Sequence, residues 1–192
     1  FKLGSNVKSV IRKGEEVEVT IAKDGAEEVI TADAVLLSTG RKPFTAGLGL
    51  EEMGIKMDRS IQINEHYQTN IPNIYAVGDV AGNKPMLAHL AEEEAIFVAE
   101  HLAGQHGHVD YNSIPGVIYT HPEVATVGKS EDDLKAEGTP YKVGKFPFLA
   151  NSRAVANLDK DGIVKIMACS KTDKILGIHM VGPYCSELIN EA

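Results

Sequence analysis

The chain has 192 residues, of which 43% are hydrophobic and 24% charged, a composition typical of a soluble globular protein. A net charge of −8, with 19 scattered Lys and Arg residues, argues against a nucleic-acid-binding surface, which needs clustered basic side chains. No apolar run approaches the roughly 20 residues that a helix needs to cross a bilayer. The length allows one or two domains with hydrophobic cores.

Two cysteines, Cys169 and Cys185, are too few for a disulfide scaffold and suit a reducing compartment. Cys169 lies in an alternating strand pattern, which favours a core thiol over a reactive one. Phe1 begins in the middle of a pattern and Ala192 ends inside another. We therefore expect a fragment of a longer protein, and no signal peptide is visible.

The first forty residues are typical of strands. The segments 7–11, 16–21 and 28–30 either alternate polar and apolar residues or are rich in β-branched ones. The Asp-Gly pair at 24–25 predicts a hairpin turn. The continuous apolar run 34–38 predicts a strand buried on both faces. It ends at Gly40, where small residues would let a dinucleotide approach, although a plain turn is the alternative.

A short apolar run, Ile74 to Val77, is followed by Gly78 and Asp79. The run predicts a short buried strand, and ligands of α/β sheets bind at the carboxyl ends of strands. Asp79 could there accept a hydrogen bond from a sugar-like hydroxyl. Alternatively, it could cap the next helix. The residues themselves leave both readings open.

A helix is predicted from Met86 to Leu102, with Pro85 at its first position and Gly104 as its C-cap. Its start would place unpaired backbone amides and a partial positive charge beside Asp79. A carboxylate and an amide cluster together suit a ligand with hydroxyls and carbonyl oxygens, such as a flavin dinucleotide. The amides in question are those of Met86, Leu87, Ala88 and His89.

A connector at 105–116 contains the expected domain boundary, and an antiparallel α+β domain is predicted from residue 117 onward. A short helix should start at Ser130, capped reciprocally with Asp133, and end at Gly138. The intervals between His101, His106 and His108 disfavour a metal site, and none is expected. The five expected strands span 116–120, 124–127, 141–146, 163–168 and 174–181.

The strings "TNIPNIYAVGDV" and "PMLAHLAEEEA" resemble the second flavin-binding segment of the pyridine nucleotide-disulfide oxidoreductases. "PMLAH", "VIYTHPEVATVGKSE" and "YKVGKFPFLANSRA" resemble the members that oxidise dihydrolipoyl groups, and the resemblance covers essentially the whole chain. It implies an α/β plus α+β fold. Residues 1–40 would end an NAD-binding domain, 41–112 would be the second segment of a three-layer ββα FAD-binding domain, and 113–192 an antiparallel-sheet dimerisation domain.

The resemblance also implies roles for individual residues. Asp79 would hold the ribityl chain of FAD, and the backbone of Met86, Leu87, Ala88 and His89 would approach the isoalloxazine carbonyl edge. Gly40 and Val7 would line the NAD site. The parent enzyme would oxidise protein-bound dihydrolipoamide and reduce NAD⁺ through a redox disulfide and FAD.

The implied partners are a second copy of the chain and the lipoyl domains of 2-oxoacid dehydrogenase or glycine cleavage complexes. The implied compartment is the mitochondrial matrix, or the cytoplasm of a bacterium. Related glutathione- or mercury-reductase enzymes are the alternative, against which "PMLAH" and "FPFLANSRA" argue. A dimerisation module without activity is another.

Three parts of the family's apparatus are missing from these residues: a Cys-x4-Cys pair, a G-x-G-x-x-G loop and the acid/base His-Glu pair. We therefore expect no catalytic residue in this chain. We also expect that the chain alone neither holds FAD tightly nor turns over substrate.

Overall fold

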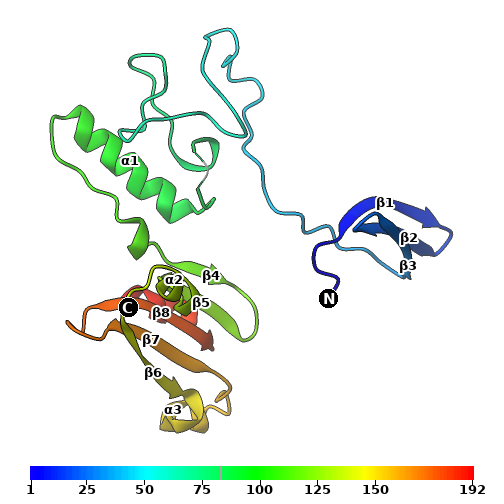
Figure 1. The fold of residues 1–192 in the computed structure, drawn as a ribbon, viewed down its shortest axis with the longest axis vertical. Coiled ribbons are helices and arrows are strands. Elements are labelled where there is room, and N and C mark those ends of the chain that lie inside the picture. Colours follow the sequence, from blue (N-terminus) through cyan, green and yellow to red (C-terminus); the bar gives the residue numbers. More distant parts are fainter. Residues whose placement is uncertain (83) are drawn as a thin grey trace. The chain divides into compact units, whose positions relative to one another are not determined.

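A computed structural model describes residues 1–82 and 84–192. The sequence also predicts a turn at residues 80–84, and one of these residues, Asn83, lies outside the described residues. The chain forms two compact units, residues 1–42 and 43–192 (Figure 1). Among the helices of the described residues, none is both long and apolar enough to cross a bilayer.

The first unit contains a three-stranded antiparallel sheet in the order β1-β2-β3. Asp24 and Gly25, both with positive φ (51° and 83°), form the two-residue turn between the second and third strands. Ile21, in the central strand, is 8% exposed. The predicted hairpin is confirmed, and the strands are β1 (Asn6–Lys13), β2 (Glu16–Lys23) and β3 (Ala26–Ala32).

The buried strand predicted at 34–38 is wrong. These residues have no regular structure, and the side chains of Leu36 and Leu37 are 90% and 76% exposed. An apolar run becomes a strand buried on both faces only where sheet neighbours and covering layers exist. The sheet of this unit ends at β3, and no strand among the described residues pairs with the run.

Residues 43–82 and 84–87 consist mostly of turns and irregular backbone, and they contain a small hydrophobic core. Ala76, in the run 74–77, is buried, as expected, but the regular strand predicted there is wrong. Tyr75 makes only an isolated bridge with Gln68, because the chain turns sharply just before the run and again at Gly78. The core consists of Leu50, Ile55, Ile61, Ala76 and Ala81.

The long helix α1 (Ala88–Leu102) starts two residues later than predicted. Leu87 is its N-cap, with an extended backbone, so Pro85 precedes the helix instead of occupying its first position. The predicted end is confirmed: Gly104 has a φ of +76°, and the amide of Gln105 donates to the Glu100 carbonyl at 2.9 Å.

The remainder forms a five-stranded antiparallel sheet in the order β4-β5-β8-β7-β6 (Figure 1). All five predicted strands are confirmed to within two residues at either end. The strands are β4 (Gly116–Ile118), β5 (Glu123–Gly128), β6 (Tyr141–Pro147), β7 (Ile163–Cys169) and β8 (Ile175–Gly182). The helices are α2 (Glu131–Ala136), α3 (Ser152–Ala156) and α4 (Cys185–Leu188).

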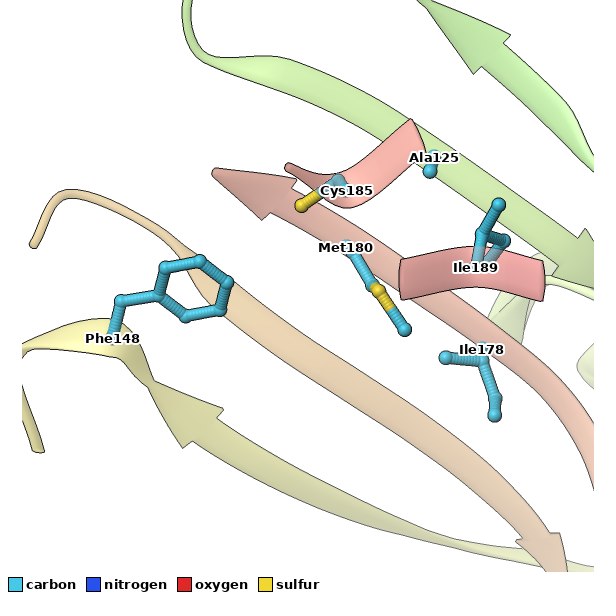
Figure 2. Packing of buried hydrophobic residues seen from close by; sticks show 6 residues of the cluster. All are labelled: Ala125, Phe148, Ile178, Met180, Cys185 and Ile189. Carbon is cyan, nitrogen blue, oxygen red and sulfur yellow. The ribbon is translucent and has the colours of Figure 1, made fainter. Parts of the chain in front are cut away.

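Side chains from the strands and from the C-terminal segment form the core of this sheet domain. Figure 2 shows Met180 and Ile178 of β8 on the side of the sheet where Cys185 and Ile189 lie. Burial raises the pKa of the Cys185 thiol. Cys169, by contrast, is only half-buried at the end of β7 and is not the core thiol that the strand pattern predicts. The buried cluster is Ala125, Phe148, Ile178, Met180, Cys185 and Ile189.

The capping box of α2 is formed as predicted. The amide of Asp133 donates to the Ser130 hydroxyl oxygen at 3.2 Å, and the Ser130 amide donates to the Asp133 carboxylate at 2.9 Å. Hydrogen bonds from the Ser130 hydroxyl and amide lower the pKa of the Asp133 carboxyl below its ordinary value.

Replacing Ser130 by Ala should lower the free energy of unfolding by about 1 kcal/mol, because an orphan amide of α2 loses its acceptor. A carboxyl group with a lowered pKa stabilises the fold above its unfolded pKa, and this contribution is lost as the pH falls through the folded pKa. The effect of the substitution should therefore shrink in acid. Denaturant unfolding followed by circular dichroism at neutral and acidic pH measures this. Ser170→Ala, at an exposed turn, is the matched control, and equal effects of the two variants would contradict the capping role.

Candidate functional site

The Gly78–Asp79 pair lies in a single 3-10 turn, Gly78–Val80, which we call the glycine turn. Gly78 has a φ of +70°, and a Cβ built there would lie 3.0 Å from the Cβ of Ala91. The glycine turn therefore packs directly against the first turn of α1. A side chain at position 78 would be opposed both by this contact and by the left-handed backbone.

Asp79 is exposed on the glycine turn, where its carboxylate can accept a hydrogen bond from an external donor. The N-cap of α1 is Leu87, and no side chain hydrogen-bonds there as a cap. The alternative reading of Asp79, as the cap of the following helix, is therefore wrong.

The start of α1 supplies the backbone donors. By helix geometry the amides of Ala88, His89 and Leu90, here called the amide cluster, have no acceptor within the helix, and the Ala91 amide makes the first helical bond, to Leu87 at 3.1 Å. Ala88 and His89 thus lie in the first turn, as expected. Met86 and Leu87 do not, because the helix starts later, and the Leu87 amide donates to the Pro85 carbonyl at 3.1 Å.

The imidazole of His89 makes a hydrogen bond within the chain. Its Nε2 lies 2.7 Å from the carbonyl oxygen of Pro115, which can only accept, so Nε2 carries the proton and donates. The side chain thereby connects α1 to the segment before β4. The contribution of His89 to a ligand site is its backbone amide.

The sequence did not indicate the structural role of Glu94 in this region. Glu94 is fully buried on α1, and its Oε2 accepts a hydrogen bond from the Gly78 amide at 2.9 Å. Its Oε1 accepts from Lys84 Nζ, and from the Tyr111 hydroxyl at 3.1 Å. In the run Glu92–Glu94 it resembles an exposed charge, but it lies four residues after Leu90, on the buried side of the helix.

Two tyrosines complete this polar cluster. Tyr67 and Tyr111 share a hydrogen bond of 2.7 Å between their hydroxyls, and Lys84 Nζ lies 4.6 Å from the centre of the Tyr67 ring. Burial raises the pKa of both tyrosines, and the negative charge of Glu94 raises both further. The hydroxyls therefore stay protonated near neutral pH, which suits their role as donors.

The two residues expected at a nicotinamide site lie in the first unit. Val7 is a 60% exposed residue of β1, at the point where the register with β2 shifts. Gly40 is exposed in the irregular segment after β3, with a φ of +87°. A Cβ there would meet no atom within 4 Å, so the backbone conformation alone favours glycine.

No group of three or more potential metal ligands occurs among the described residues. His101 instead stacks on His66, with ring centroids 4.6 Å apart, and on Phe97 at 6.1 Å.

Gly78→Ala should destabilise the protein more than Gly54→Ala does. Both glycines have positive φ (+70° and +68°), so each substitution carries a backbone cost of about 1–2 kcal/mol, but only at position 78 does the new Cβ meet a neighbour. Denaturant unfolding of the two variants isolates the packing contribution. Equal losses would show that the glycine turn does not press against α1.

Two family models match the chain. The model "Pyridine nucleotide-disulphide oxidoreductase" matches residues 1–95, and that family's "dimerisation domain" matches residues 114–192. The chain is 54% identical over 197 aligned residues to the mitochondrial dihydrolipoyl dehydrogenases of Bos taurus and Homo sapiens. The alignment covers 100% of the chain and 38% of each relative, so the chain spans well under half of their length.

Solved structures agree with this similarity. LpdA from Mycobacterium tuberculosis superimposes with a TM-score of 0.85 at 29% identity, over 97% of this chain and 40% of LpdA. The HOCl-induced flavoprotein disulfide reductase RclA from Escherichia coli superimposes with a TM-score of 0.82 at 26% identity, over 97% of this chain and 42% of RclA. The mixed α/β architecture with antiparallel sheets expected from the sequence is confirmed.

Proposed function

Because this chain belongs to the pyridine nucleotide-disulphide oxidoreductase family, we propose that it is the FAD-contacting and dimer-forming part of a dihydrolipoyl dehydrogenase. The protein that carries it oxidises protein-bound dihydrolipoamide and reduces NAD⁺. The observation that supports this proposal most directly is the contact of Gly78 with Ala91, which holds an exposed carboxylate beside a helix N-terminus.

The donors and acceptors of this region fit FAD. Asp79 offers an acceptor for the ribityl hydroxyls. The amide cluster offers N–H donors for a carbonyl oxygen, and the N-terminal end of α1 favours negative charge nearby. Bound FAD supplies the electron transfer between the redox disulfide and NAD⁺. The chain's own residues hold the cofactor and favour its reduced, more negative form through the helix dipole.

Of the four amides that the sequence indicates, Ala88 and His89 would make these contacts from within the helix. Met86 and Leu87 would line the approach ahead of it. Val7 and Gly40 would line the NAD site from the first unit, where Gly40 leaves its backbone open to a ligand.

This chain supplies positioning groups in the proposal and no reacting group. Its two cysteines lack the Cys-x4-Cys spacing of a redox pair, and Cys185 is buried in the core of the sheet domain. The sheet domain would form a homodimer, in keeping with the dimerisation-domain match. The substrate would be carried by lipoyl domains of 2-oxoacid dehydrogenase or glycine cleavage complexes in the mitochondrial matrix. The names of the similar enzymes, which call them mitochondrial, support this compartment.

Asp79→Ala should weaken FAD binding by the protein that carries this chain roughly tenfold to a hundredfold. That range corresponds to a lost hydrogen bond to a charged group, about 1.5–3 kcal/mol. Titration of the apoprotein with FAD, followed by flavin fluorescence, measures the dissociation constant. Asp58→Ala, an exposed aspartate in the same segment, is the control and should bind FAD like the wild type.

The same preparations test the activity. The wild-type protein should form NADH from dihydrolipoamide and NAD⁺, with activity falling in Asp79→Ala and restored in part by excess FAD. Reduction of glutathione disulfide in place of dihydrolipoamide oxidation would favour the disulfide-reductase alternative. Unaltered FAD affinity in Asp79→Ala would contradict the ribityl contact.

A further inference from the structure

Glu94 is a buried carboxylate that the proposed flavin contacts do not use. We propose that Glu94 is a positioning residue: it holds the glycine turn and the start of α1 in one fixed arrangement, and so sets the affinity for FAD. This inference rests on the proposed function and adds to it a residue that makes no contact with the cofactor.

The first contact holds the glycine turn. Val77, at the N-cap of this 3-10 turn, has no side-chain acceptor. Instead, Glu94 Oε2 on α1 accepts a hydrogen bond from the Gly78 amide at 2.9 Å. The acceptor therefore comes from sixteen residues further along the chain. Because Asp79 follows Gly78 directly, its backbone position depends on this bond.

The second set of contacts holds the chain on the other side of the site. Lys84 lies between the glycine turn and α1, and its ammonium group pairs with Glu94 Oε1. The two side chains are 19% and 1% exposed. A carboxylate this deeply buried must be paired and hydrogen-bonded, and the Tyr111 hydroxyl supplies the remaining donor at 3.1 Å.

One carboxylate therefore connects both elements that the proposed site needs. Its Oε2 binds the segment that carries Asp79, while its Oε1 binds the linker that leads into the amide cluster. A ligand that contacts Asp79 and the amides together requires a defined spacing between them, to within about half an ångström. Removing the carboxylate frees the two segments from each other and should weaken FAD binding.

A merely structural role would predict a different result. In that case any substitution that destabilises the fold equally would weaken FAD binding equally. Leu134→Ala is the appropriate control, because Leu134 is a fully buried core residue of α2, whose truncation lowers stability through a cavity.

The experiment compares Glu94→Ala, Glu94→Gln, Tyr111→Phe and Leu134→Ala in the whole protein that carries this chain. For each apoprotein, denaturant unfolding gives stability, titration with FAD gives the dissociation constant, and fluorescence anisotropy reports the mobility of the bound flavin. The anisotropy is the measurement that general destabilisation should leave unchanged while the protein remains folded.

Glu94→Ala should raise the dissociation constant for FAD about tenfold or more, on the scale of a lost hydrogen bond to a charged group, and lower the anisotropy of the bound flavin. Glu94→Gln should show a smaller loss, because its amide oxygen can still accept from Gly78. Tyr111→Phe should show a smaller loss too, and it provides the test if Glu94→Ala does not fold. Leu134→Ala should bind FAD within about twofold of the wild type despite its lower stability.

Wild-type FAD affinity and anisotropy in both Glu94 variants would overturn the positioning role and leave the proposed function intact. Equal weakening in Leu134→Ala and Glu94→Ala would also overturn it, since stability alone would then explain the loss. A wild-type protein that does not bind FAD would overturn the proposed function itself, and this inference with it.

Discussion

The close approach of Gly78 to Ala91 is the constraint on which the candidate site depends. A left-handed backbone and a Cβ position 3.0 Å from the Cβ of Ala91 both favour glycine at position 78, and glycine lets the turn lie against the first turn of α1. An exposed carboxylate and a helix N-terminus are thereby brought to the same place. Neither feature alone would specify a ligand, since isolated acids and helix ends are common on protein surfaces.

The polar groups of this region fall into an exposed set and a buried set. At the surface, Asp79 and the first residues of α1, Ala88 and His89, are exposed and can meet a ligand. In the interior, Glu94 is balanced by Lys84 and by hydrogen bonds from Gly78 and Tyr111. The buried charges thus satisfy one another and leave the exposed groups free for binding.

Much of the fold could be predicted because its signals are local. The Asp-Gly turn at 24–25, the capping box at Ser130 and the glycine end of α1 each depend on residues a few positions apart. The five strands of the antiparallel sheet follow from alternating patterns between turns, and they pair with one another inside the described chain.

The wrong predictions concern features that depend on distant partners. The apolar run 34–38 would be a buried strand only with sheet neighbours. The run Ile74–Val77 makes a single isolated bridge, because the chain turns sharply just before it and again at Gly78. The predicted start of α1 is two residues too early, because the backbone at Leu87 is still extended. Glu94 was missed because a charged residue in a run of glutamates usually faces solvent, and only its place opposite the glycine turn shows otherwise.

The most direct test of the account is an experimental structure, with FAD bound, of the protein that carries this chain. We expect the Asp79 carboxylate to lie within hydrogen-bond distance of a ribityl hydroxyl, about 2.5–3.0 Å between oxygens, with the amides of Ala88 and His89 facing the carbonyl edge of the flavin. A flavin bound elsewhere, with Asp79 facing solvent, would contradict the assignment of this site.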